Sequence, residues 1–448
     1  MDFDYHSKDL DELAAYIDKA IASARNENGN NNADLNILIS IAEIAKKHAL
    51  SAKNGFVSGS AFLKELIDLS SPNYIYNPPI DSRNITTIPL YPSHSSQNQK
   101  ISIKNSEGKP IILGKCLGQG GEGSVYKIPA LPGKVAKVYH KRYLGSSNCQ
   151  NAEKKIRYLL KKKDAAFIED TLIAALPEEI IYYHDGSFAG YIMPQFATTT
   201  KLFDVQREGH RRKLFPDLDY RGLIVIAYNL AEAVNHLHRH GIVVGDMNQN
   251  NILVHPDGTI GLIDCDSFDV TDSDTGEHFP CCVGLAELLA PELQVVRTLR
   301  NASFTEKSDS FSLAIHIFRL LMDNADPFCF SLTGDARTTS VSIVDSGNHI
   351  VNGECVYLRD VPGKQIPRWS PTLEILPEDI QILFRRTFEY TASTAAASVS
   401  KRPTASEWMD ALQRFYQMPL TRCSKDEFHL YMPTLAECPF CLKQNNAD

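Results

Sequence analysis

Three side chains with oxygen donors lie close together in the sequence. Asp246 and Asn251 form an Asp-x-x-x-x-Asn pair before a short apolar segment, and Asp264 ends a second apolar segment after an Asp-Gly turn. Two antiparallel strands joined by that turn would bring Asn251 and Asp264 together at one end of a hairpin. Such a group of oxygens suits Mg²⁺ bound to phosphates, with one carboxylate left to orient a nucleophile. Polar turns on a surface hairpin are the alternative, so the rest of the chain must supply the other parts of the site.

A glycine-rich segment upstream has the spacing of a phosphate-binding loop. Gly118, Gly120, Gly123 and Val125 form the pattern G-x-G-x-x-G-x-V. Glycines at these positions let backbone N–H groups approach phosphate oxygens with no side chain in the way. The segment lies between two predicted strands, whereas a dinucleotide-binding turn should open a helix. The pattern therefore favours a nucleotide-covering loop over a dinucleotide site, although glycines at this spacing can also mark a simple turn.

Two charged residues further along could complete a nucleotide site. Lys137 lies fourteen residues after Gly123 in an apolar strand, where it could hold the α- and β-phosphates. A helix predicted at about 150–163 carries Glu153, the candidate acid to pair with Lys137. An exposed strand lysine and a solvated helix glutamate are the alternatives.

The order of these motifs resembles that of the eukaryotic-like (Hanks-type) protein kinase family over residues 111–418. GDMNQNN takes the place of the catalytic loop HRDLKPEN, and IDCDS takes the place of DFG. Downstream, 290–292 reads as the APE motif, Asp309 as the buried helix acid and Arg402 as the partner of Glu292. The resemblance implies an α+β, two-lobed protein-kinase-like fold.

The resemblance also assigns roles to the residues of the site. Asp246 would orient the acceptor hydroxyl, while Asn251 and Asp264 would hold Mg²⁺ (or Mn²⁺). Lys137 would grip the phosphates of ATP, with Glu153 fixing its position, and the glycine loop would cover them.

The contacts to adenine are implied by the same resemblance. Met193 would lie behind the base, and the Pro194 carbonyl and the Phe196 N–H would form hydrogen bonds with it. A proline loses nothing at the first of these two positions, because only its carbonyl is required. An ordinary core strand is the alternative.

Several residues depart from the family pattern. Val244 and Gly245 replace the His and Arg that precede the catalytic Asp. In the family this arginine senses the phosphorylated activation segment. Without it, we expect less need for activation-segment phosphorylation. Asn248 stands where Ser/Thr kinases have a lysine, and this loop is also similar to those of aminoglycoside and choline kinases. Cys265 and Asp266 replace Phe-Gly. Asp266 either binds Mg²⁺ or caps the following turn.

Four soft or borderline metal ligands fall within nineteen residues near the end of the chain: Cys423, His429, Cys438 and Cys441. A tetrahedral Cys₃His site for structural Zn²⁺ would let this segment fold with almost no core. A redox dithiol or simply buried cysteines are the alternatives, but no thioredoxin-like context surrounds the pair. The segment is also similar to the zinc ribbon that follows the kinase domain in bacterial kinase-like proteins with D-x-D in place of DFG.

The elements that must position these residues divide the chain into several parts. Apolar residues at helical spacing recur in the first 70 residues, and a Pro-, Ser- and Asn-rich stretch follows them. The expected parts are a helical module (1–70), a linker (71–108), a kinase-like domain (109–418, with lobes at 109–196 and 197–418) and a zinc-ribbon tail (419–448).

Composition limits the class of protein and its expected location in the cell. At 448 residues, with 22% charged and 43% hydrophobic, the chain has an ordinary globular balance and room for two or three domains. A net charge of −8 gives no reason to expect nucleic acid. The acidic start does not resemble a signal peptide, and no apolar run could span a bilayer. Ten cysteines are too sparse for a disulfide scaffold, so we expect a cytoplasmic protein without membrane contact.

We therefore expect an ATP-dependent Ser/Thr protein kinase of bacterial cytosolic signalling. The pair of Glu292 and Arg402, which belongs to protein kinases and not to antibiotic kinases, favours a protein acceptor. An ATP-binding pseudokinase scaffold and a small-molecule phosphotransferase are the alternatives. The N-terminal helices or the zinc ribbon could dock partner proteins, but the sequence identifies neither the substrate nor the activating signal.

Overall fold

The computed structural model describes residues 103–144, 151–333 and 346–442. These residues belong to a unit of the chain that spans Asn98–Asp448. The expected helical module (1–70) and most of the expected linker lie outside the described residues. Along the described residues, no helix combines the length and the apolar character needed to cross a membrane.

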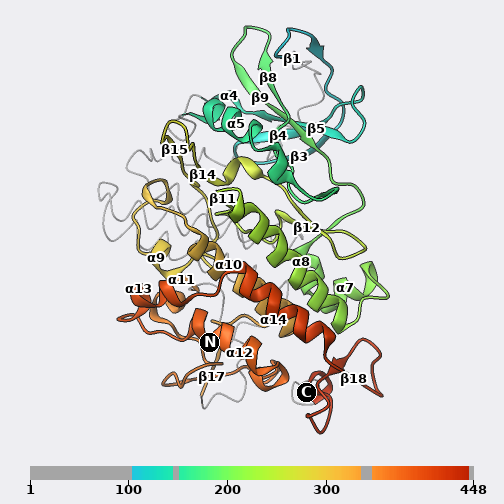
Figure 1. The fold of residues 1–448 in the computed structure, drawn as a ribbon, viewed down its shortest axis with the longest axis vertical. Helices are drawn as coiled ribbons and strands as arrows, with labels where there is room; N and C mark the ends of the chain where they lie inside the picture. The colour runs from blue at the N-terminus through green and yellow to red at the C-terminus, as the bar shows by residue number, and fades with distance from the viewer. Residues whose placement is uncertain (1–102, 145–150, 334–345, 443–448) are drawn as a thin grey trace, which may run out of the picture. The chain divides into compact units, whose positions relative to one another are not determined.

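An antiparallel sheet forms the first part of the described chain (Figure 1). Its strand order is β2-β1-β8-β9-β5-β4-β3. The strands are β1 (Ile103–Asn105), β2 (Pro110–Ile111), β3 (Cys116–Gln119), β4 (Gly123–Lys127), β5 (Lys134–Tyr139), β8 (Glu179–Tyr183) and β9 (Phe188–Pro194). The linker was expected to run to residue 108, but β1 lies inside that range and pairs with β8. The sheet therefore begins before the expected end of the linker.

Two short helices accompany this sheet, α4 (Lys141–Leu144) and α5 (Ala152–Leu160). α5 lies within the helix predicted at about 150–163. Its apolar face buries Ile156 and Leu159 against the core, because residues three apart share one face of a helix. A small hairpin, β6 (Phe167–Ile168) with β7 (Thr171–Leu172), follows the 3₁₀ turn Lys163–Ala166.

Helices dominate the second part. The longest of the described helices is α8 (Tyr220–Arg239), whose first turn is capped by the Asp219 carboxylate. Its neighbours are α10 (Glu306–Leu321) and α14 (Ala405–Gln417), which lies beside α8 in Figure 1. The remaining helices are α6 (Leu202–Gln206), α7 (Glu208–Leu214), α9 (Pro291–Gln294), α11 (Ser346–Asn352), α12 (Glu378–Phe388) and α13 (Ala395–Ser398).

Helix α10 is buried along nearly its whole length, so it forms the centre of the helical part. Phe318 packs edge-to-face against Phe384 of α12, with ring centroids 5.1 Å apart. The capping box of Thr305 and Ser308 fixes where α10 begins. This rigid helix carries Asp309 into the candidate site.

The hairpin predicted from the sequence is confirmed. β12 (Ile252–Val254) pairs antiparallel with β13 (Ile260–Leu262), and the Asp257 side chain accepts hydrogen bonds within the turn. Asn251 and Asp264 therefore lie at the same end of the hairpin. β10 (Thr200–Lys201) adds a third strand beside β12.

The segment that follows Asp264 belongs to a second small sheet. It consists of β14 (Asp269–Thr271), flanked by β11 (Ile242–Val243) and β15 (His278–Phe279). A further two-stranded sheet pairs β16 (Ser331–Leu332) with β17 (Lys364–Gln365). The remaining 3₁₀ turns are Cys265–Ser267, Leu299–Asn301, Leu373–Ile375 and Val399–Lys401.

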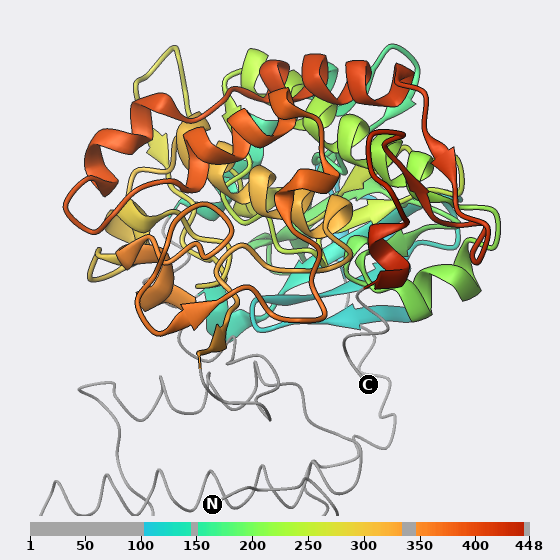
Figure 2. The same cartoon turned by 90° about the horizontal axis from the view of Figure 1, so that it is seen from below.

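The last described segment folds back onto the helical part. β18 (Thr421–Arg422) pairs with β19 (Leu430–Tyr431), and the backbone N–H of Tyr220 donates to the carbonyl of Phe428. The ring of Phe440 lies 5.0 Å from that of Tyr220, centroid to centroid. Figure 2 shows this segment, in dark red, next to the green helix α7.

Candidate active site

The loop between β11 and β12 is held by one buried carboxylate. Asp309 accepts hydrogen bonds from the backbone N–H groups of Val244 (2.7 Å) and Gly245 (2.9 Å). Nε2 of His238 lies 2.9 Å from the same carboxylate, whose side chain is only 1% exposed. A buried carboxylate is stable when several donors satisfy it. Asp309 therefore fixes the backbone that leads directly into Asp246.

Gly245 is required at its position for two reasons. Its φ of 72° lies in the left-handed region, and a Cβ built there would come 2.8 Å from Cβ and Sγ of Cys281. Cys281 thus leaves no room for a side chain on residue 245 in this backbone conformation. The departure seen in the sequence at this position is a packing feature of the fold.

The three oxygen residues singled out in the sequence do come together. The Asn251 side-chain amide donates to Oδ2 of Asp246 at 3.3 Å. The Asn251 carbonyl accepts from the backbone N–H of Ile263 (2.9 Å), which lies next to Asp264. Asp264 adopts a left-handed backbone with φ of 63°, and the backbone N–H of Ser267 donates to its carbonyl. Carboxylate and amide oxygens are the donors that Mg²⁺ prefers, so the donor types of this group suit that ion.

Lys137 reaches this group from the sheet. Across β4, β5 and β9 it is paired with Val125 on one side and Tyr191 on the other. Its Nζ donates to Oδ1 of Asp264 at 2.5 Å and to Oδ1 of Asp266 at 2.7 Å. Lys137 is only 5% exposed, so the alternative of an exposed strand lysine is excluded.

The expected pairing of Glu153 with Lys137 is wrong for this structure. Glu153 accepts instead from the guanidinium of Arg157 at 2.7 Å, and the Tyr182 hydroxyl lies 3.4 Å from the same oxygen. Arg157 follows Glu153 by one helical turn, so the two side chains share a face of α5. The acidic partners of Lys137 are Asp264 and Asp266, with Glu122 at 3.9 Å.

Of the two roles expected of Asp266, the structure bears only on the cap, and Mg²⁺ binding stays a prediction. Asp266 does not cap the following turn, where Asp264 is the first flanking residue. Its carboxylate accepts from Lys137, from the Tyr139 hydroxyl (2.5 Å) and from the Tyr191 hydroxyl (2.8 Å). Its side chain is 6% exposed, against 40% for Asp264.

Three residues of this cluster were missed in the sequence: Glu122, Tyr139 and Tyr191. Tyr139 follows Lys137 by two positions, so strand alternation predicts that both face the same side. Glu122 is the acidic residue inside the glycine loop. Tyr191 could not have been found, since its place opposite Lys137 depends on the register between β5 and β9.

The cluster concentrates negative charge. Burial, with a smaller contribution from Asp264, raises the pKa of Asp246 to about 6. Burial and the nearby Asp266 raise the pKa of Glu122. Burial opposes the charge on Lys137, but the carboxylates of Asp266 and Asp264 outweigh it and raise the pKa of the ammonium. Three carboxylates, those of Asp264, Asp266 and Glu122, surround the Lys137 ammonium, so negative charge is in excess there.

The glycine loop is a tight strand–turn–strand. The N–H of Gly120 donates to the carbonyl of Gly123 at 2.9 Å, and a Cβ at Gly123 would lie 2.5 Å from the Val138 carbonyl. A Cβ at Gly118 would meet nothing within 4 Å. Val125 is half-buried and packs against the main core.

The residues expected to contact adenine lie where β9 ends. Met193 is buried, and Pro194 is paired with Lys134 of β5. The ring of Phe196 packs on Gly261 of β13, where a Cβ would come 2.6 Å from the ring. Their contacts with a nucleotide stay predictions.

The ion pair expected between Glu292 and Arg402 is confirmed. Both terminal nitrogens of Arg402 donate to the two carboxylate oxygens of Glu292, each at 2.7 Å, and Arg402 is fully buried. Such a two-pronged pair is both directional and strong. It ties the first turn of α9 to the segment before α14.

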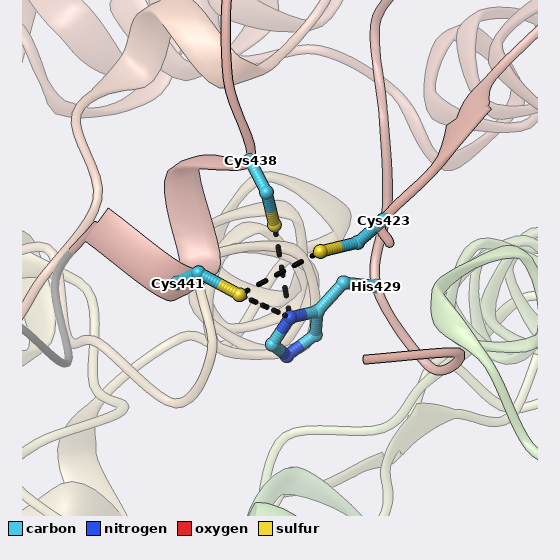
Figure 3. A group of neighbouring side chains, drawn as sticks. All are labelled: Cys423, His429, Cys438 and Cys441. Atoms are coloured by element: carbon cyan, nitrogen blue, oxygen red, sulfur yellow. Dashed lines mark hydrogen bonds between the residues drawn. The ribbon is translucent and has the colours of Figure 1, made fainter. Parts of the chain in front are cut away.

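The four residues predicted to bind a metal converge in the last described segment (Figure 3). Sγ of Cys423 lies 3.6 Å from Sγ of Cys441, and Nδ1 of His429 lies 3.5 Å from Cys441 and 3.7 Å from Cys438. A tetrahedral zinc site with Zn–S near 2.3 Å has ligand–ligand edges of about 3.5–3.8 Å. The backbone N–H of Lys425 donates to Cys423 and helps lower the pKa of that thiol to about 7. The cluster could thus hold Zn²⁺.

The other face of His429 connects this cluster to α7. Nε2 lies 3.6 Å from Glu208 and 3.7 Å from Asp426. Arg212 donates to both of these carboxylates, each at 2.5 Å. Because Arg212 of α7 binds the two carboxylates next to His429, the cluster and α7 form one polar network.

Comparison with known proteins agrees with this geometry. The protein kinase domain family matches residues 112–350. Protein kinase YegI of Escherichia coli K12 is 30% identical over 353 residues, which is 77% of this chain and 50% of that protein. YegI of Escherichia coli O157:H7 is 29% identical over 354 residues, with 77% and 51% covered.

A more distant relative is ribosomal protein S6 kinase alpha-2 of Mus musculus. It is 24% identical over 237 residues, which is 50% of this chain and 29% of that protein. The chain spans about half the length of the YegI proteins that it matches.

Proposed function

The chain belongs to the protein kinase family, and on that premise we propose that it transfers the γ-phosphate of ATP to Ser and Thr hydroxyls of protein substrates in bacterial signalling. The observation that supports this most is the meeting of Asp246, Asn251, Asp264 and Lys137 in one place. These groups come from separate segments and have the chemistry that phosphoryl transfer needs.

Each group has a defined task in this proposal. Asn251 and Asp264 offer the oxygens that would hold Mg²⁺, which supplies neutralisation of phosphate charge when bound. Lys137 donates to the α- and β-phosphates. Asp246 accepts the hydrogen bond of the substrate hydroxyl and takes its proton as the hydroxyl oxygen bonds to the γ-phosphorus and ADP leaves. Catalysis rests mainly on positioning and on charge stabilisation.

A protein acceptor is favoured by the ion pair of Glu292 and Arg402. This buried two-pronged pair belongs to the protein-kinase pattern and not to that of the antibiotic kinases. The same proposal includes a kinase domain at about 109–418 in a cytoplasmic protein, with the helical module (1–70) and the tail (419–448) as docking elements.

The test is a labelled-ATP transfer assay with generic protein acceptors. We expect Asp246→Ala to lower the rate by about 10²–10⁴-fold while ATP binding changes little. Asp410→Ala, an exposed acid on α14, is the matched control and should retain the wild-type rate. Equal turnover by wild type and Asp246→Ala would sink the assignment.

A second candidate is an ATP-binding pseudokinase scaffold. The Asn248 side chain accepts from the backbone N–H (2.9 Å) and the amide (3.2 Å) of Asn250, so it holds the loop and supplies no cation for the γ-phosphate. Nucleotide binding without any transfer in the assay above would favour this candidate.

We also propose that Cys423, His429, Cys438 and Cys441 bind one structural Zn²⁺ as a zinc ribbon. Elemental analysis of the purified chain should find about one zinc per molecule. Cys438→Ser should lose it and lower the melting temperature, whereas Cys282→Ser, at an exposed cysteine outside the cluster, should do neither. Well-folded wild-type protein without zinc would rule out the ribbon.

A further inference from the structure

The Asp266 carboxylate is enclosed by three donors from the sheet. Oδ1 accepts from Nζ of Lys137 (2.7 Å) and from the hydroxyl of Tyr191 (2.8 Å), and Oδ2 accepts from the hydroxyl of Tyr139 (2.5 Å). Both oxygens are thus engaged. A buried carboxylate with fewer partners would be unstable, so these contacts account for its burial.

The three donor side chains project from the same face of the sheet. Lys137 and Tyr139 are two positions apart on β5 and so point to the same side, and Tyr191 lies opposite Lys137 on β9. All three therefore meet the loop after β13 as a preformed cradle. Both tyrosines are fully buried, with no more than 2% of either exposed, which holds their hydroxyls in place.

Asp264 and Asp266 differ in what they can still bind. The Asp264 side chain is 40% exposed and close to Asn251, so it can take a hydrated cation. The Asp266 side chain is 6% exposed and its oxygens are used by protein donors. A metal ion would have to compete with the Lys137 ammonium and two tyrosine hydroxyls to reach it.

We propose that Asp266 is the positioning residue that holds Lys137 for the phosphates of ATP, in the place expected for Glu153. The inference rests on the proposed function of this site. When Asp264 turns to a metal ion, Lys137 keeps Asp266 as its partner. Because Glu153 is bound to Arg157, the described part of α5 supplies no acidic partner to Lys137.

The test compares Asp266→Asn with Glu153→Gln, since both changes remove charge and keep side-chain size. Binding of a fluorescent ATP analogue is measured with Mg²⁺ and again in EDTA. We expect Asp266→Asn to weaken binding about tenfold in both conditions, because it removes one charge-assisted partner of Lys137. Glu153→Gln should stay within about twofold of wild type, as expected for an exposed helix pair.

A double-mutant cycle shows whether Asp266 acts through Lys137. In a Lys137→Met background, Asp266→Asn should cause no further loss of binding, whereas independent contributions would add. The double variant Tyr139→Phe, Tyr191→Phe keeps the rings and the acid but removes both hydroxyls. This double variant should also weaken binding of the ATP analogue, so the inference can still be tested if Asp266→Asn does not fold.

Three outcomes would overturn the inference. These are wild-type binding by Asp266→Asn, a loss that appears only with Mg²⁺, which would make Asp266 a metal ligand, or an equal loss in Glu153→Gln. Nucleotide binding is read without a protein acceptor, so a wild-type chain that binds ATP but transfers nothing refutes only the proposed function.

Discussion

Gly245 offers a sharp test of how the candidate catalytic loop is built. Substitution Gly245→Ala places a Cβ 2.8 Å from two atoms of Cys281 in a backbone with φ of 72°. The left-handed conformation costs a non-glycine residue about 1–2 kcal/mol. Overpacking against a buried side chain costs about 1–3 kcal/mol more. We therefore expect the free energy of unfolding to fall by about 2–5 kcal/mol.

Gly276 is a matched control, because its φ is 71° and a Cβ there would meet nothing within 4 Å. Gly276→Ala should show the backbone cost alone, and the entropy gain of an alanine in the unfolded chain is the same at both sites. Urea unfolding gives both stabilities, and the difference of about 1–3 kcal/mol is the contact with Cys281. Equal destabilisation by the two variants would refute this reasoning.

Two further predictions follow from the buried charges. The transfer rate should rise with pH through about 6, because burial raises the pKa of Asp246 and the protonated carboxyl cannot accept the hydroxyl proton; a kcat/KM profile without a change between pH 5 and 7 would contradict this role. Glu292→Gln leaves the fully buried Arg402 without its anion and should destabilise the chain by about 3–5 kcal/mol, whereas Glu389→Gln, at an exposed pair with Arg385, should cost under about 1 kcal/mol in the same urea titration.

Local sequence patterns were enough to predict the features that depend on residues close together in the sequence. The Asp-Gly turn and its two apolar flanks predicted the hairpin that places Asn251 next to Asp264, because turn chemistry sets strand pairing. Strand alternation could also have placed Tyr139 on the face of Lys137. The four Cys and His residues of the tail lie within one short segment, so their convergence was readable from spacing.

Pairings between distant segments could not be read in this way. The network of Glu208 and Arg212 behind His429 joins residues more than 200 positions apart. The beginning of the sheet was also missed, because β1 is too short to show alternation and is defined by its pairing with β8.

The partner of Lys137 shows most clearly what the sequence determined and what only the tertiary structure decided. The sequence by itself determined that a lysine, a glycine loop and a group of oxygen side chains would serve one nucleotide site, since each residue type is dictated by its chemistry. Only the tertiary structure decided between Glu153 and Asp266. That choice depends on the register of β5 with β9 and on the position of α5, and both are set by packing over the whole domain.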